Sequence, residues 1–452
     1  MKNNHNMYIN YKRSYKKRRR SGKNKFLIIL FIIILAIGLG LATYYIVNAQ
    51  MNSKNNEKNQ TNINKSEDEF ATEQLLEESV VQVTQQPAPT VVTEVALLPT
   101  PTIVAEVVTV NEPIETEDTR IPTKVKGVYV TSRIAGTNLI DELVELVDTT
   151  EVNAMVIDIK DDQGKITYAM DNDLAQEIGA VTNTISDVET LVSTLKEKGI
   201  YLIARIVAFK DPYLAEKRHE FAIKNQDGSL YRDNNDECWV NPYNHEVWDY
   251  LVDVASQAAA VGFDEIQFDY IRFSTGGGIS EANFGEEAKT KNKQEIIAEF
   301  TKYAYEKIKP LGVFVSADVY GTIISSSIDA GLVGQDYVEM SRYLDYICPM
   351  IYPSHFGEGN YGIEHPDLEP FNIIRKVLTA SKTKLDLIPT GEHRAIVRPW
   401  LQDFTASWVK HHMKYGGPEL REQIKGVYGA GYEEWLLWNA SANYSEEGLL
   451  EE

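Results

Sequence analysis

The sequence has few residues of the types that bind metals or form disulfides. It contains only two cysteines, Cys238 and Cys348, so it has neither a disulfide framework nor a cysteine zinc site, although one bridge between them stays open. Only eight histidines are present, without an H-E-x-x-H motif, and the adjacent pair His411 and His412 would point in different directions on a helix. The sequence therefore indicates no metal site, and nothing in it requires a cofactor.

Motifs of two other enzyme classes are also missing. The serine nucleophile elbow G-x-S-x-G does not occur. No glycine-rich dinucleotide turn follows the first strand that the sequence predicts, and the spacing of Gly276-Gly277-Gly278 does not match a phosphate loop. These absences argue against a serine hydrolase and against a dinucleotide-binding sheet.

Charge is divided unevenly along the chain. Residues 1–25 contain ten lysines and arginines and no acidic residue. The rest of the chain has 35 basic against 66 acidic residues, a net charge of −31. Because phosphate binding needs a basic surface, this acidic body argues against nucleic acid and is compatible with neutral or cationic partners.

A single uncharged run, residues 26–47 (FLIILFIIILAIGLGLATYYIV), follows the basic tail. Its 22 residues are enough for a helix that spans a bilayer. The basic flank predicts a single-pass cell-membrane protein with residues 1–25 in the cytoplasm and everything after Val47 outside the cell. The alternative is a signal peptide cleaved at Val47-Asn48-Ala49, but the apolar core of such peptides is usually shorter.

Residues 48–120 show no sustained helical or strand period. The first part is rich in Asn, Lys, Gln and Glu, and the second part mixes Pro, Thr and Val. This composition cannot bury a core and predicts a disordered extracellular linker. The folded domain is expected to comprise residues 121–452.

From Lys124 onward, short apolar strands alternate with amphipathic helical stretches. Such alternation predicts βαβ units and a parallel sheet, and eight repeats indicate an α/β fold of the (β/α)8 TIM-barrel type, with an open doubly wound sheet as the alternative. The expected strands are 125–131, 154–160, 201–209, 265–273, 313–321, 346–356, 384–392 and 433–440. The residues after 440 hardly suffice for an eighth helix.

The stretch from Gly262 to Phe273 (GFDEIQFDYIRF) is the most informative of these. Side chains alternate between the two faces of a strand, so Ile266 and Phe268 should face the helices, while Gln267 and Asp269 face the lumen. Asp269 falls near the carboxyl end of its strand, where barrels of this type carry their chemistry.

The same alternation predicts further charges inside the barrel. Asp158 and Lys160 on the second strand, Arg205 on the third and Asp318 on the fifth should point inward. Buried charges are costly unless they are paired, so this ring is either a neutralising network or a site. Because Asp269, Asp318 and Glu392 all fall at expected carboxyl ends, a site is favoured.

Aromatic side chains are expected at the same end of the barrel. An apolar ring with a polar edge suits a sugar, although some of these residues will be ordinary core. They are Trp239, Tyr243, Tyr270, Phe273, Tyr320, Tyr352, His355, Trp400 and Trp438.

Two carboxylates on either side of a glycosidic bond are the minimal equipment for its hydrolysis. Asp269 would be the nucleophile or base. Asp318 is the first choice for the general acid, Glu392 the second and Asp403 the third, and Asp403 is otherwise expected to bind substrate. Arg205 and Arg272 would orient the carboxylates. The remaining expected sugar contacts are Trp239, Tyr243, Tyr320, Tyr352, His355, Trp400 and Trp438.

At this point the sequence resembles a bacterial family of TIM-barrel proteins regarded as glycoside hydrolases and catalogued as a domain of unknown function. The matching motifs cover nearly the whole domain. They are RIVAFKDP (205–212), WVNPY (239–243), GFDEIQFDYIRF (262–273), SADVYG (316–321), PMIYPSHF (349–356) and RPWLQDF (398–404). The family is distantly similar to α-amylase-like and α-galactosidase-like barrels. That similarity implies that Asp269, at the strand-four position, is the nucleophile.

These observations predict a membrane-anchored extracellular glycosidase that acts on a cell-envelope or environmental polysaccharide. Two alternatives from other classes stay open. One is a non-catalytic barrel that binds cell-wall glycan, and the other is a metal-assisted hydrolase such as a deacetylase.

Overall fold

The structure, a computed structural model, describes residues 118–450. The expected basic tail, membrane span and linker as far as residue 117 lie outside the described residues. Within residues 118–450, no helix combines the length and the apolar character needed to cross a membrane. The side chain of Arg120 donates to the carbonyl of Val313 at 2.7 Å and pairs with Asp345 at 2.7 Å, so the folded domain includes residues just before 121.

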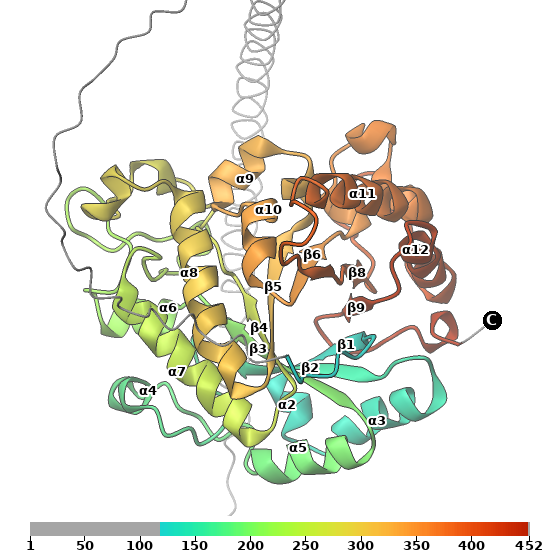
Figure 1. Cartoon of the computed structure of the whole chain (residues 1–452), viewed down its shortest axis with the longest axis horizontal. Helices are drawn as coiled ribbons and strands as arrows, with labels where there is room; N and C mark the ends of the chain where they lie inside the picture. Colours follow the sequence, from blue (N-terminus) through green and yellow to red (C-terminus); the bar gives the residue numbers. More distant parts are fainter. Residues whose placement is uncertain (1–117, 451–452) are drawn as a thin grey trace, which may run out of the picture. The chain divides into compact units, whose positions relative to one another are not determined.

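The described residues form a closed parallel barrel with its helices on the outside (Figure 1). Neighbouring strands pair in the order β5-β4-β3-β2-β1-β9-β8-β6-β7, and β5 also pairs with β6, which closes the ring. Both β7 and β8 pair with β6, so these two short strands share one position. The strands are β1 Lys126–Val130, β2 Ala154–Lys160, β3 Tyr201–Val207, β4 Glu265–Asp269, β5 Phe314–Tyr320, β6 Tyr346–Met350, β7 Ile396–Val397, β8 Trp400–Gln402 and β9 Trp435–Trp438.

Most of the helices begin at a residue whose side chain accepts a hydrogen bond from the backbone of the first turn. For example, the Asn292 side chain accepts from the Glu295 amide while the Glu295 carboxylate accepts from the Asn292 amide, and this capping box starts α8. The helices are α2 Ser132–Ala135, α3 Ile140–Thr149, α4 Asp173–Ile178, α5 Val188–Glu197, α6 Pro212–Lys217, α7 His245–Val261, α8 Lys293–Ile308, α9 Ser327–Val333, α10 Tyr337–Met340, α11 Pro370–Leu385 and α12 Gly417–Gly429. After β9 only a short 3-10 helix, Glu446–Gly448, follows in the described residues.

Seven of the eight expected strands are found at the expected places, but the strand at 384–392 is wrong. Residues 370–385 form α11, and the seventh position in the barrel is filled by β7 and β8. The alternating apolar residues that predicted a strand belong instead to the end of this helix and to the turns that follow it. The real strand is interrupted at Arg398-Pro399, because proline cannot donate a ladder hydrogen bond.

The alternation of faces is confirmed on the other strands. Ile266 and Phe268 pack in the large cluster between strands and helices. A second cluster fills the lumen, and its members alternate with those of the first along each strand. It contains Val125, Tyr129, Ala154, Val156, Tyr201, Ile203, Phe314, Tyr346, Cys348, Tyr352, Trp400 and Leu436. Cys238 and Cys348 are both buried and free, so the bridge left open by the sequence does not form.

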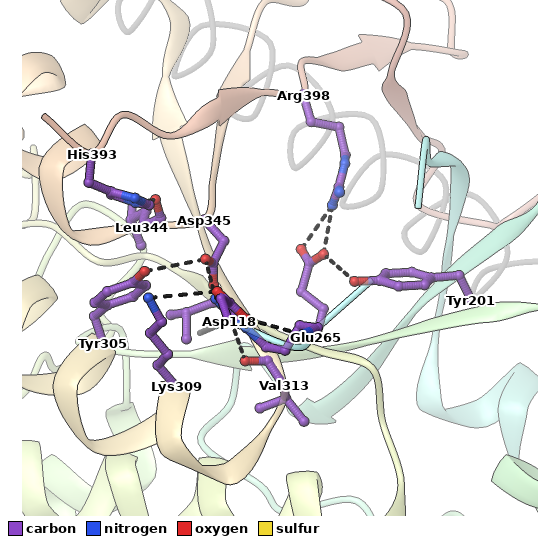
Figure 2. Close-up of polar contacts among 12 residues, drawn as sticks. Asp118, Tyr201, Glu265, Tyr305, Lys309, Val313, Leu344, Asp345, His393 and Arg398 are labelled. Carbon is purple, nitrogen blue, oxygen red and sulfur yellow. Dashed lines mark hydrogen bonds and ion pairs between the residues drawn. The ribbon is translucent and has the colours of Figure 1, made fainter. Parts of the chain in front are cut away.

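Buried ion pairs close the amino-terminal end of the lumen (Figure 2). The Arg398 Nη1 donates to both carboxylate oxygens of Glu265 at 2.9 Å, and the side chains of both residues are fully buried. Arg398 Nε donates to Glu434 at 2.9 Å, and the Tyr201 hydroxyl donates to Glu265 at 3.0 Å. Glu265 thus has a structural role at the closed end of the barrel.

Candidate active site

A cavity of about 410 Å³ opens at the carboxyl ends of the strands. This is the end at which (β/α)8 barrels carry their active sites. Five strands bring a polar or aromatic side chain to the cavity: Arg205 from β3, Asp269 from β4, Asp318 from β5, Trp400 from β8 and Trp438 from β9. The cavity is thus the place where the expected charged residues and aromatic residues meet.

Asp269 is held in a fixed orientation. Its Oδ2 accepts from Arg205 Nε at 3.0 Å and from Nη2 at 2.6 Å, and its Oδ1 accepts from the Tyr270 amide at 2.6 Å. Charge-assisted bonds of this kind are short and directional, so they fix the position of the carboxylate. The expectation that Arg205 orients Asp269 agrees with this geometry.

The backbone immediately after Asp269 adopts an unusual conformation. Tyr270 has φ of 48°, in the left-handed region that residues other than glycine rarely occupy. This turn ends β4 at Asp269, four residues before the expected end, and places the Tyr270 ring in the wall of the cavity. Strain of this kind is concentrated at functional sites.

Asp318 lies beside Asp269 but in a different environment. Phe268 pairs with Ala317 across β4 and β5, so the next residues, Asp269 at the end of β4 and Asp318 two residues before the end of β5, lie side by side. The Trp400 indole donates to Asp318 Oδ1 at 2.6 Å. Burial, together with the negative charge of Asp269, raises the pKa of Asp318 well above its usual range. One carboxylate is held by an arginine and the other favours its proton, which is the division that acid catalysis requires.

Arg205 also binds two further carboxylates. Its Nη1 donates to Asp158 at 2.7 Å and its Nη2 donates to Asp162 at 3.0 Å. Burial raises the pKa of Asp158 to about 6, although Arg205 and the Tyr129 hydroxyl favour its ionised form. Sequence reasoning placed Asp158 in the lumen but missed Asp162, whose only signal is its position two residues after β2.

Arg272 does not orient a carboxylate, contrary to the expectation. Its Nη1 donates to the carbonyl of Phe273 at 2.8 Å, and its guanidinium lies over the rings of Trp239, Tyr270 and Tyr320 at 4.7–5.0 Å. Among the described residues it makes no ion pair, yet it lines the cavity. The aromatic contacts therefore hold a cation in the wall of the cavity.

Five of the expected aromatic contacts line the cavity. Trp438 stacks on Tyr129 with ring centroids 4.2 Å apart, and Tyr352 packs edge-on against His355 at 5.1 Å. Burial lowers the pKa of His355, so its ring is neutral near pH 7. The five residues are Tyr320, Tyr352, His355, Trp400 and Trp438.

Trp239 and Tyr243 are corrections to the expected sugar contacts, because neither lines this cavity. Trp239 is buried behind Tyr270, and its indole donates to Asp233 at 2.9 Å. Tyr243 packs on Phe273, and its hydroxyl donates to the carbonyl of Lys291 at 2.9 Å. The aromatic pattern could not separate such core rings from those that face a cavity.

Two expected carboxylates also lie elsewhere. Glu392, whose placement at a strand end is wrong, lies on a half-exposed turn and pairs with Arg342. Asp403 accepts from the Ser445 amide at 2.7 Å and from the Ser445 hydroxyl at 2.8 Å, and it thereby fixes the segment after β9. Asp318 is left as the carboxylate beside Asp269.

Several cavity residues come from loops in which the sequence shows no periodicity. Tyr270 was recognised as an aromatic of this end but not as a site residue. Sequence reasoning missed Thr275, Thr322 and Phe356 in the connections after strands, and Asp329 and Leu332 on α9.

A closed (β/α)8 barrel with paired carboxylates and an aromatic cavity defines this chain as a glycosidase-type enzyme. The family model described as "Putative glycosyl hydrolase domain" matches residues 127–444, and the chain belongs to this family. No curated protein matches the chain.

Solved structures include similar proteins. A hypothetical protein from Ruminiclostridium thermocellum ATCC 27405 is 40% identical over 42% of this chain and 97% of that chain, with a TM-score of 0.40. The glycoside hydrolase domain of PgaB (BpsB) from Bordetella bronchiseptica is 12% identical, with a TM-score of 0.52, and the match covers 73% of this chain and 100% of that domain. The similarity to the PgaB domain shows a shared fold.

Proposed function

We propose that the chain is a membrane-anchored extracellular glycoside hydrolase that cleaves O-glycosidic bonds of a cell-envelope or environmental polysaccharide with two carboxylates. The observation that carries the proposal is the pair Asp269 and Asp318, which lie near the carboxyl ends of adjacent strands in one aromatic cavity but have contrasting environments. The anchor is residues 26–47 and rests on the sequence alone.

The pair acts in two steps. An Asp269 oxygen attacks the anomeric carbon while the bond to the leaving oxygen breaks, and the Asp318 proton passes to that oxygen. Asp318, now ionised, then takes a proton from a water molecule whose oxygen displaces Asp269 from the anomeric carbon. Arg205 keeps the attacking carboxylate oriented throughout, and the aromatic rings contact the apolar faces of the sugar.

The position of the pair on neighbouring strands predicts retention of anomeric configuration. Neighbouring strands lie about 4.8 Å apart, which suits the carboxylate separation of about 5–5.5 Å found in retaining enzymes rather than the wider gap of inverting ones. We expect the first product to have the configuration of the substrate, as read by proton NMR in the early phase of hydrolysis. An initial product of opposite configuration would contradict this assignment of Asp269 as nucleophile.

Asp318→Asn is expected to lower kcat by about 10²–10⁴-fold, because it removes the proton donor and keeps the acceptor for the Trp400 indole. In the wild type, kcat/KM should fall at alkaline pH as Asp318 loses its proton. The stability of the folded state should also decrease at alkaline pH. The raised pKa of Asp318 means that the folded state binds the extra proton, so the free energy of unfolding decreases as pH rises through that pKa.

The asparagine variant lacks this titration and should keep its stability at alkaline pH better than the wild type. pH–rate profiles and unfolding midpoints at acidic and alkaline pH check both expectations. Equal loss of stability in the two proteins would show that Asp318 does not hold the proton.

The function itself is tested with the full chain in mild detergent, incubated with purified cell-wall glycans and a panel of α- and β-linked polysaccharides. Mass spectrometry of released oligosaccharides should show products for one class of glycan. Glycan binding without products would instead favour the non-catalytic glycan-binding barrel. Protease accessibility of the barrel on intact cells tests its extracellular location.

A further inference from the structure

Two histidines and one glutamate converge beside the cavity. Glu358 and His365 lie on the segment after β6, and His411 lies on the segment after β8. One ligand atom from each of the three lies within 4.8 Å of the others. His411 Nδ1 lies 2.6 Å from Glu358 Oε1, and His365 Nδ1 lies 3.7 Å from the same oxygen. No local motif joins residues so far apart in the chain, so sequence spacing gave no sign of this cluster.

The His365 ring is arranged like the ring of a metal-binding histidine. Its Nδ1 is buried, points toward Glu358 and has no hydrogen-bond partner, although a buried polar atom normally has one. Its other nitrogen, Nε2, lies 3.7 Å from the Glu364 carboxylate. Metal-bound histidines commonly present their second nitrogen to a carboxylate in this way.

We propose that Glu358, His365 and His411 bind a divalent transition metal, with Zn²⁺ as the best match. Two imidazoles and one carboxylate are ligands that Zn²⁺ accepts, with water in the fourth position, whereas Ca²⁺ and Mg²⁺ require oxygen ligands. Zn–N and Zn–O bonds of about 2.0–2.2 Å place ligand atoms about 3.3 Å apart. The widest separation must close by about 1.5 Å, and side chains that are 25–61% exposed can move that far.

The metal would act as a clamp and not as a catalyst. The hollow that contains the three ligands has a volume of about 290 Å³ and shares His355 and Phe356 with the cavity described above. The two segments are already linked by the Met413 amide, which donates to Asp367 at 3.2 Å. The contact of His411 with Glu358 also joins them, and a metal on these two residues would strengthen that connection and fix the wall that holds His355.

The matched control is the neighbouring histidine. His412 lies next to His411, but its Nδ1 donates to the Val409 carbonyl at 2.6 Å and takes no part in the cluster. The full chain without a histidine tag is stripped of metal, and Zn²⁺ or Mg²⁺ is then added. Isothermal titration calorimetry and bound metal after dialysis are measured for the wild type, His411→Ala, His412→Ala and Glu358→Gln.

We expect one Zn²⁺ per chain and a thermal midpoint about 4 °C higher at a zinc concentration 100 times Kd, with no response to Mg²⁺. His411→Ala and Glu358→Gln should each weaken binding by at least about tenfold, and His412→Ala should bind as the wild type does. Absence of bound Zn²⁺ in the wild type, or equal binding by His411→Ala and His412→Ala, would overturn the proposal. Metal binding and the thermal midpoint are measured without glycan cleavage. The test of the metal site is therefore independent of the test of the proposed hydrolysis.

Discussion

Asp269→Asn is expected to lower kcat by at least about 10⁴-fold while the fold is kept. The amide is nearly isosteric with the carboxylate and can still accept a hydrogen bond from the Tyr270 amide. It cannot form the bond to the anomeric carbon or carry the charge that Arg205 stabilises. Initial rates on the glycan that gives products measure the loss, and the thermal midpoint shows that the variant is folded.

The control for this variant is Glu392→Gln. The sequence placed Glu392 at a strand end as a candidate acid, and the structure places it on an exposed turn with Arg342. Its substitution should leave kcat within about twofold of the wild type, because surface changes rarely exceed about 0.5 kcal/mol. A large loss in Glu392→Gln, or undiminished turnover in Asp269→Asn, would refute the assignment of the nucleophile.

Arg398→Met is expected to reduce the free energy of unfolding by about 3–5 kcal/mol. The side chains of Arg398 and Glu265 are both fully buried, and Glu434 is the second partner of the guanidinium. Removing the arginine leaves two carboxylates in the closed end of the barrel without their cation, and Figure 2 shows the pair with Glu265. Urea denaturation followed by tryptophan fluorescence gives the change in midpoint.

Arg394→Met is the matched control for this measurement. Arg394 is in the same segment and also pairs with an acid, Asp386, but both side chains are about half exposed. Exposed pairs contribute about 0–1 kcal/mol, so the midpoint should hardly move. Similar losses in the two variants would mean that the buried network does not stabilise the barrel.

The parts of the fold that sequence could predict are those in which alternation has a physical cause. On β4 and β5 every second residue faces the lumen, so the positions of Asp269 and Asp318 at neighbouring strand ends were predictable. The seventh strand was not, because β7 and β8 are too short to show a period and are separated by Arg398-Pro399. Residues 384–392, which the sequence suggested as the seventh strand, form the end of α11 and the turns after it.

In the site, likewise, only the residues on regular strands were predictable. The roles of Asp269 and Asp318 stay predictions, while their positions are confirmed. The third partner of Arg205, Asp162, and the loop residues around the cavity depend on how distant segments fold back on the barrel. No periodic pattern or motif in the sequence indicates how those segments fold. The same holds for His365 and His411, which meet only because two loops pack together.

The motif that begins at Arg398 links the two ends of the barrel. Arg398 pairs with Glu265 at the closed end, and Trp400, two residues later on the same face, donates to Asp318 at the open end. A single inserted or deleted residue between Val397 and Trp400 would turn one of these side chains to the opposite face. This segment should therefore tolerate less variation in length than any surface loop, because one change would disturb stability and proton transfer together.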